Sequence, residues 1–379
     1  MEKQAAQDLI QFINESPTNY HAIQNIKREL TEHGFKQLFS GEAWHIERGE
    51  KYFVTKNHSS LFAFVPGKGD VAENGFKLIC AHSDSPTFRI KPSAEMAGEA
   101  KYLKLNTEVY GGPILYTWFD RPLSMAGRVL LKSDNPLKPA VRFVNFKRPL
   151  LVIPHIAIHF NRTINEQGNP LSKQKDMLPV LGMINGHFEK DNFLLKLIAG
   201  EMQVEPELIL DFDLTLYDCE KGCFTGLQDE FISCGKLDDL AMAHAGMKAL
   251  IASQDCDKTK VLAVFDNEEV GSGTKQGAGS PILRTIIERI VAGLGGNTED
   301  LYRAIHHSFM ISADMAHALH PNYPEKHDPT NHPVMNGGPV IKLNANQKYV
   351  TDGDSAAVFA TVCRMAGVPY QTFVNHSDM

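Results

Sequence analysis

Two adjacent glutamates, Glu268 and Glu269, stand where a short apolar run ends. The run, residues 261–265, is rich in β-branched and aromatic side chains, which predicts a buried strand. On extended backbone, neighbouring side chains point to opposite sides, so one glutamate could bind a metal ion while the other faces a water molecule. An exposed acidic loop is the simpler interpretation of such a pair. Other candidate ligands elsewhere in the chain favour the metal site.

Three further positions carry histidine or carboxylate side chains next to predicted elements. His82 ends an apolar run, and Asp84 could hydrogen-bond its second imidazole nitrogen, as metal-bound histidines usually require. Asp238 and Asp239 precede a predicted helix, where one of them could instead be a helix cap. Asp314 follows another apolar run. Because sites in open α/β sheets gather at the carboxyl ends of strands, we expect these groups and the glutamate pair to meet there.

One histidine with several carboxylates suits Zn²⁺, Mn²⁺ or Co²⁺ and needs no thiolate. A pair of such ions with a bridging aspartate would lower the pKa of a bound water to roughly 7 and polarise a carbonyl. A glutamate outside the ligand set could then transfer the proton. The chemistry expected of this cluster is peptide or amide hydrolysis.

The rest of the chain must supply the elements that position these groups. Two amphipathic helices are predicted within residues 5–33. From about residue 235 onward, predicted strands and helices alternate, which indicates an α/β sheet with helices on both faces. The predicted strands cover 52–56, 60–66, 76–81, 261–265, 309–313 and 372–374, and the later helices cover 240–250, 281–294 and 355–365.

Residues from about 100 to 160 differ in character, because Gly-Pro and Asn-Pro turn signals separate β-rich runs there. The spacing predicts a barrel or sandwich-like module. Its predicted strands cover 114–119, 127–132, 141–146, 156–160 and 208–216, with a polar loop at 161–180 and a helix at 188–202. We therefore predict a discontinuous α/β catalytic domain over 1–98 and 232–379, interrupted by a β-rich oligomerisation domain over 99–231.

Composition excludes several classes of function. The 379-residue chain is 43% hydrophobic with a net charge of -7 and no basic run, which argues against a nucleic-acid partner. The sequence contains no stretch of ~18 apolar residues, so no membrane span is predicted, and the first residues lack a signal-peptide pattern. Six cysteines without a Cys-x-x-Cys pair are typical of a reduced, cytoplasmic protein. Cys219 and Cys223 are a weaker alternative as soft metal ligands.

Several long motifs resemble the M18 family of zinc aminopeptidases, the aspartyl aminopeptidases. The motifs occur in the same order as in the family, and the resemblance spans nearly the whole chain. They cover residues 81–86, 118–123, 153–159, 237–240, 266–271 and 312–323. The resemblance implies a zinc-peptidase-type mixed sheet flanked by helices and interrupted by the β-rich insertion. It also implies a dinuclear aminopeptidase, with two Zn²⁺ per subunit, that releases N-terminal Asp or Glu from small peptides.

The resemblance also implies a role for individual residues. Glu268 would be the general base, and Asp84 would orient the imidazole of His82. The implied metal ligands are His82, Asp238, Glu269 and Asp314, with Asp238 bridging. Lys342 would meet the acidic substrate side chain. His159 would reach from the insertion into a neighbouring subunit's site, within a dodecameric homo-oligomer.

One feature departs from the family pattern, and two others suggest alternative sites. Family members continue for some tens of residues past the position of Met379 and carry a final histidine ligand there, so we expect a truncated record or an inactive scaffold homologue. The segment 271–277 resembles a nucleotide-binding loop, but Glu268 and Glu269 would repel phosphates and the glycine spacing is wrong. The histidines of residues 317–332 are expected to pack and hydrogen-bond within a loop rather than bind a second metal.

Overall fold

The computed structural model describes residues 2–184 and 192–378. The chain forms two compact units, Met1–Ala313 and Asp314–Met379. The first unit contains two six-stranded sheets and a short hairpin of β11 (Cys223–Thr225) and β12 (Phe231–Ser233). None of the helices in these described ranges is long and apolar enough to cross a membrane.

The first sheet is mixed, as the sequence predicts. Its strand order is β1-β2-β3-β13-β4-β14, in which β4, β13 and β14 run parallel and β3 runs antiparallel to β13. The strands are β1 (Lys36–Gln37), β2 (Tyr52–Lys56), β3 (Ser60–Val65), β4 (Phe76–His82), β13 (Thr259–Phe265) and β14 (Phe309–Ser312).

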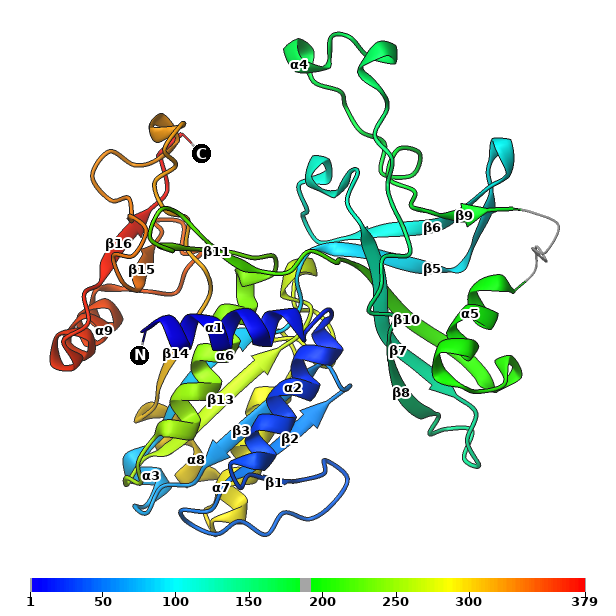
Figure 1. The fold of residues 1–379 in the computed structure, drawn as a ribbon. Helices are drawn as coiled ribbons and strands as arrows, with labels where there is room; N and C mark the ends of the chain where they lie inside the picture. Colours follow the sequence, from blue (N-terminus) through cyan, green and yellow to red (C-terminus); the bar gives the residue numbers. More distant parts are fainter. Residues whose placement is uncertain (1, 185–191, 379) are drawn as a thin grey trace. The chain divides into compact units, whose positions relative to one another are not determined.

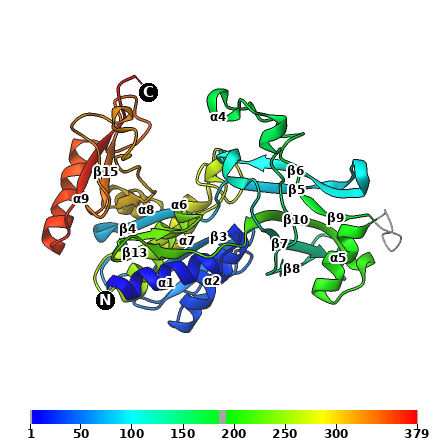
Figure 2. The same ribbon diagram turned by 45° about the horizontal axis from the view of Figure 1, so that its top comes forward.

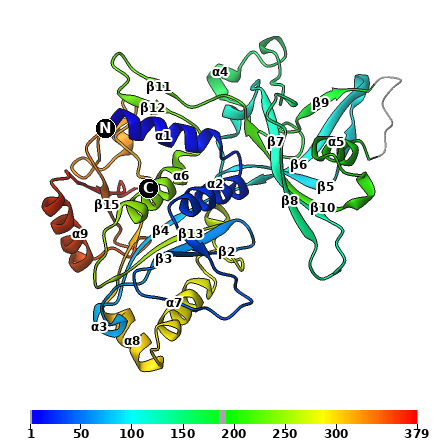
Figure 3. The same cartoon turned by 60° about the horizontal axis from the view of Figure 1, so that its bottom comes forward.

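Helices cover both faces of this sheet (Figures 1 and 3). Strand β3 explains why, because all of its residues are buried and alternate side chains point to opposite faces. Leu61 and Ala63 join one core, and Phe62 and Phe64 join the other. The first core packs against α1 (Glu2–Asn14), α2 (Asn19–Glu32) and α6 (Leu237–Ala252), and the second against α3 (Val71–Asn74), α7 (Ile282–Gly293) and α8 (Thr298–His306).

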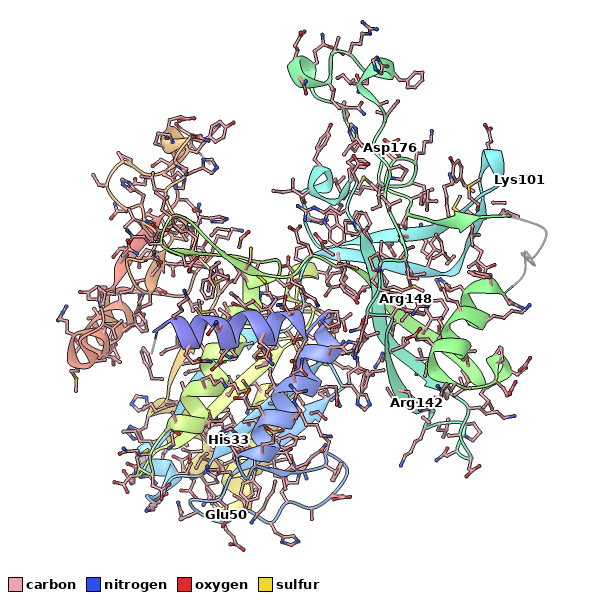
Figure 4. All side chains as sticks on the ribbon, in the orientation of Figure 1. His33, Glu50, Lys101, Arg142, Arg148 and Asp176 are labelled. Atoms are coloured by element: carbon pink, nitrogen blue, oxygen red, sulfur yellow. The ribbon has the colours of Figure 1, made fainter. Side chains whose placement is uncertain are left out.

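The second sheet is antiparallel throughout and has the order β8-β7-β10-β5-β6-β9 (Figure 2). Helix α5 (Phe193–Met202) packs on it through Leu194 and Ile198. Arg148, labelled in Figure 4, forms a 2.7 Å ion pair with Glu201 of this helix. The strands are β5 (Thr87–Ala97), β6 (Tyr102–Tyr110), β7 (Leu123–Leu131), β8 (Ala140–Asn145), β9 (Val180–Met183) and β10 (Ile209–Asp218).

Several expectations for the insertion were wrong. The module is one open sheet rather than a barrel or sandwich. Residues 114–119 and 156–160 are not strands but contain the 3-10 turns Leu115–Trp118 and Ile158–Phe160. Their β-branched composition suggested strands, yet within these two ranges a single isolated bridge forms, between Phe119 and Ile153. The expected loop at 161–180 holds one helical turn, α4 (Ile164–Gln167), and the helix expected from 188 begins at Phe193, residues 188–191 lying outside the described ranges.

Strands β5 and β6 were not predicted. Because β5 begins at Thr87, the antiparallel sheet starts within the range 1–98 that we assigned to the catalytic domain. The discontinuous domain division remains a prediction, with its first boundary better placed before Thr87.

The second unit is built around a parallel pair, β15 (Val340–Leu343) and β16 (Gln371–Val374), joined through helix α9 (Gly353–Ala366). Parallel strands need such a crossover. The helix begins with a capping box between Asp352 and Ser355 and ends at Gly367 in the left-handed conformation. A 3-10 turn, Pro324–Lys326, lies in the long loop before β15.

Candidate metal centre

Pairing of β4 with β13 brings two of the predicted groups together. The strands are parallel and in register, with Phe265 opposite His82. Their carboxyl ends therefore lie side by side, and Glu268 and Glu269 follow β13 at the edge where His82 ends β4. Asp238 reaches the same place from the start of α6, because its carboxylate Oδ1 lies 3.4 Å from His82 Nε2.

Two groups of side chains in the described residues could hold a metal ion, and both include His82. In one group, ligand atoms of His82, Asp238 and Asp239 lie within 4.8 Å of one another. In the other group, the same limit holds for His82, Glu268 and Glu269. Asp239 is fully buried and accepts a 3.0 Å hydrogen bond from the backbone N–H of His82, so it fixes the end of β4. The peptide bond between Asp238 and Asp239 is cis.

Asp84 links the histidine to the glutamate pair. Its Oδ1 lies 3.3 Å from His82 Nδ1. The same carboxylate accepts backbone hydrogen bonds, each 3.2 Å long, from Glu268 N–H and Glu269 N–H. The Tyr110 hydroxyl donates a further hydrogen bond of 2.6 Å to Asp84 Oδ2. This buried carboxylate therefore fixes one imidazole and the backbone of both glutamates.

The glutamate pair does not lie on extended backbone, so the expected reason for its geometry was wrong. Asn267 has a positive φ of 62°, and residues Glu268–Val270 form a 3-10 turn. Asp84 accepts the N–H groups of the first two residues of this turn, and the carboxylates of both glutamates remain near His82. Glu269 is half-buried, and Glu268 is exposed.

The carboxylates of the site repel one another. Burial and the nearby Asp238 carboxylate raise the pKa of Glu269 to about 7. Burial alone would lower the pKa of His82, but its hydrogen bonds to Asp238 and Asp84 raise that pKa to about 11. Burial would raise the pKa of Asp84, but hydrogen bonds from His82 and Tyr110 hold it below the usual value. A divalent cation would relieve this carboxylate repulsion, and one imidazole with several carboxylates is a donor set that zinc accepts.

The cluster opens into a large cleft of about 1250 Å³. Asp84, Asp238 and Glu269 lie in its wall, and so do Tyr110 and Asn267, which the sequence reasoning did not assign. The Asn267 amide donates a 2.9 Å hydrogen bond to the Tyr110 hydroxyl. A usable signal for Tyr110 was the alternating run 102–110 that ends at two glycines, which is typical of a strand.

Asp314 and Lys342 are brought together in the second unit. Lys342 Nζ lies 3.2 Å from Asp314 Oδ1 and donates a 2.5 Å hydrogen bond to the Met315 carbonyl. In the nearby loop, His327 Nε2 accepts a hydrogen bond from His320 N–H, and His332 Nδ1 contacts the Asp328 carbonyl. His159 lies elsewhere, exposed in the 3-10 turn Ile158–Phe160 of the insertion, and is not part of the His82 cluster.

A mixed sheet that gathers a histidine and several carboxylates at the ends of its parallel strands defines an α/β metal-dependent hydrolase. Comparison with known proteins gives the family. The family model described as aminopeptidase I zinc metalloprotease (M18) matches residues 12–379. The chain belongs to this M18 family and is a metallo-aminopeptidase.

Individual relatives agree with this assignment. A probable M18 family aminopeptidase 2 of Clostridium acetobutylicum is 54% identical over 377 residues, covering 100% of this chain and 87% of the relative. The solved Ape4 and Nbr1 complex contains a chain with a TM-score of 0.93 and 37% identity, covering 100% of this chain and 76% of that one. The mApe1 dodecamer of S. cerevesiae has a TM-score of 0.85 and 28% identity, and the match covers 97% of this chain and 84% of that chain.

Proposed function

We propose that this protein is a dinuclear zinc aminopeptidase that removes N-terminal Asp or Glu from small peptides. The single observation that carries the proposal is the convergence of His82, Asp238 and Glu269 at the strand ends. These residues, together with Asp314 as the family resemblance implies, would hold two Zn²⁺ ions, and Mn²⁺ or Co²⁺ could replace them. When bound, the metal supplies a polarised carbonyl and a water of lowered pKa.

The chain's own side chains would divide the remaining work. Glu268 is exposed beside the cluster and is free to take the proton from the attacking water and pass it to the leaving amine. Asp84 fixes the imidazole of His82 through Nδ1, which leaves Nε2 directed at Asp238 and available as a ligand. Neither role requires Glu268 itself to be a ligand.

The acidic preference would come from Lys342. Its ammonium lies 3.2 Å from Asp314, which the family resemblance implies as a metal ligand. An ammonium in a partly buried position binds a carboxylate through a charge-assisted hydrogen bond. Lys342 is 17% exposed, which favours this selectivity over an ordinary surface role.

We also propose a cytoplasmic homo-oligomer, a dodecamer as in the S. cerevesiae relative. The segment around His159 exposes the apolar side chains of Ile156, Ile158 and Phe160, and such patches mark protein contacts. His159 would then reach a neighbouring subunit's site. The six cysteines are free thiols, which favours a reducing compartment.

The test is Glu268→Gln, which keeps the shape of the side chain and removes its basicity. We expect unchanged metal content and a fall in kcat of at least ~10²-fold on an Asp-peptide substrate. Glu288→Gln is the control, because Glu288 forms an exposed ion pair with Arg284 on α7. A Glu268→Gln protein that loses its metal but keeps its rate would overturn the assigned roles. Absence of hydrolysis by metal-loaded wild type would favour an inactive scaffold.

A further inference from the structure

The carboxyl end of β6 reaches from the insertion sheet into the metal centre. The Tyr110 hydroxyl donates to Asp84 Oδ2 at 2.6 Å and accepts from the Asn267 amide at 2.9 Å. The next residue, Gly111, has a φ of +71°, and a Cβ there would lie 3.1 Å from the Glu269 Cβ. Two consecutive residues of one strand end thus contact both the orienting aspartate and a candidate ligand.

We propose that Tyr110 and Gly111 are positioning residues that couple the insertion sheet to the metal centre. In this inference, which rests on the proposed function, Tyr110 holds Asp84 against His82 and Gly111 sets the position of the Glu269 side chain. The insertion then tunes metal affinity as well as assembly.

The first step of the argument is the hydrogen bonding of Asp84. Its Oδ2 accepts from Tyr110 O–H and from Glu269 N–H, while its Oδ1 faces Glu268 N–H and His82 Nδ1. A buried carboxylate that loses one donor is left underpaired, and it then competes for its remaining donors. The imidazole orientation and the backbone of the glutamate turn both depend on this one group.

The second step concerns the space at Gly111. A side chain there would meet the Glu269 Cβ at 3.1 Å and its Oε2 at 3.4 Å, with Pro86 Cα at 3.5 Å on the other side. The left-handed φ is a conformation that glycine adopts at no steric cost. Any Cβ at this position must therefore displace Glu269 or strain the strand end. At neighbouring Gly112 a Cβ would meet nothing within 4 Å.

The third step explains why the strand end is held firmly enough to act. Strand β5 starts three residues after Asp84, and its first residue, Thr87, pairs with Tyr110. Thr87 also donates a 2.6 Å hydrogen bond to the Leu216 carbonyl of β10. Tyr110 is therefore paired with Thr87, which the chain connects to Asp84 and which is itself hydrogen-bonded to β10. Residues that support metal ligands typically change metal affinity 10- to 100-fold when removed.

The experiment titrates metal-free protein with Co²⁺ in competition with a chelator and follows the visible absorption of the bound ion. We expect Tyr110→Phe and Gly111→Ala each to weaken Co²⁺ affinity by roughly 10- to 100-fold and to change the absorption spectrum. The matched controls are Tyr52→Phe, which removes a buried hydroxyl that accepts from Glu47 N–H in the first sheet, and Gly112→Ala. Both controls should retain the wild-type affinity and spectrum.

A His82→Ala variant separates this inference from the proposed function. If wild type binds Co²⁺ through His82 and the Tyr110 and Gly111 variants match it in affinity and spectrum, the positioning role is wrong and the metal site stands. If His82→Ala binds as well as wild type, the metal site itself is misplaced and both proposals fall. Thermal unfolding of the metal-free proteins checks folding, and Tyr110→Phe decides the matter alone if Gly111→Ala does not fold.

Discussion

Asp84 shows how a residue that is not a candidate ligand can organise the site. It contacts His82, which is two positions away, and also the backbone of Glu268 and Glu269, which are more than 180 positions away. The contact between Asp84 and His82 could be predicted from their spacing, because a metal-binding histidine usually donates its other ring N–H to a carboxylate. The other contacts depend on strand pairing, which no local pattern reveals.

At the same scale, the sequence predicted five residues that the structure gathers in one cluster: His82, Asp84, Asp238, Glu268 and Glu269. It did so because strand ends and acidic side chains are local features. Tyr110 and Asn267 were not predicted. The hydroxyl of Tyr110 reaches the site through the fold of the insertion, and the amide of Asn267 does so from a left-handed backbone.

Lys342→Leu tests the proposed acidic preference. We expect kcat/KM for an N-terminal Asp or Glu substrate to fall roughly 10- to 150-fold, because a charge-assisted hydrogen bond is worth about 1.5–3 kcal/mol. An N-terminal Ala substrate should lose far less. Since Lys342 also pairs with Asp314, metal content must be measured alongside the kinetics. Exposed Lys348→Leu is the control, and equal losses on both substrates would make Lys342 structural.

At the scale of elements, most strands of the first sheet were easier to predict than β5 and β6 of the second sheet or apolar segments without a partner. Residues 52–56 match β2, because all the local signals agree there. Residues 114–119 and 156–160 have similar composition but leave Ile114, Ile158 and Phe160 exposed. β-Propensity reflects fit to a half-buried sheet surface, so composition alone cannot identify a segment that lacks a partner strand.

Helix α6 offers a prediction at this scale, because it carries Asp238 at its start and lies very close to the sheet. A Cβ at Gly246 would be 2.8 Å from Leu262 Cδ1 and 3.2 Å from Ile79 Cγ2. Gly246→Leu should therefore lower the free energy of unfolding by about 1–3 kcal/mol through overpacking, as measured by urea denaturation. Gly200→Leu in α5 is the matched control, since a Cβ there meets nothing within 4 Å. Equal unfolding midpoints for the two variants would contradict the close approach.

At the scale of the first unit, the two sheets are joined by a polar and aromatic contact. Arg128 of β7 forms a 2.6 Å ion pair with Asp213 and donates to the Asn57 carbonyl at 3.1 Å. Phe143 of β8 packs against the rings of Tyr20 and His21 from α2. This junction ties the insertion to the helices and turns of the catalytic sheet, and it forms part of the cleft.

Protonation of His21 should loosen this junction. Burial first, and the nearby Lys236 and Lys147 second, lower the pKa of His21 from 6.5 to about 4. The unfolded chain therefore binds a proton at higher pH than the folded one, so this stabilisation is complete above about pH 6.5 and is lost as the pH falls towards 4. In wild type, protonation should lower the free energy of unfolding by up to about 3 kcal/mol between pH 7 and 4. His21→Asn should lack this part of the pH dependence, as measured by urea unfolding over the same range. His33→Asn, on the exposed end of α2, should keep the wild-type pH dependence.

The largest scale is the proposed assembly, and it depends on the exposed apolar segment of the insertion. Phe160 is 82% exposed, with Ile156 and Ile158 each 48% exposed, so water contacts a contiguous apolar stretch unless another chain covers it. Wild type should have a mass near twelve chains of 42.1 kDa in light scattering after size exclusion. Phe160→Asp should give smaller species, because a charge would be buried in the interface without a partner. Leu137→Asp is the control: Leu137 is 91% exposed on the turn between β7 and β8, so its variant should keep the wild-type mass. If Phe160→Asp also keeps that mass, this segment does not form the interface, and the proposed reach of His159 into a neighbouring site fails with it.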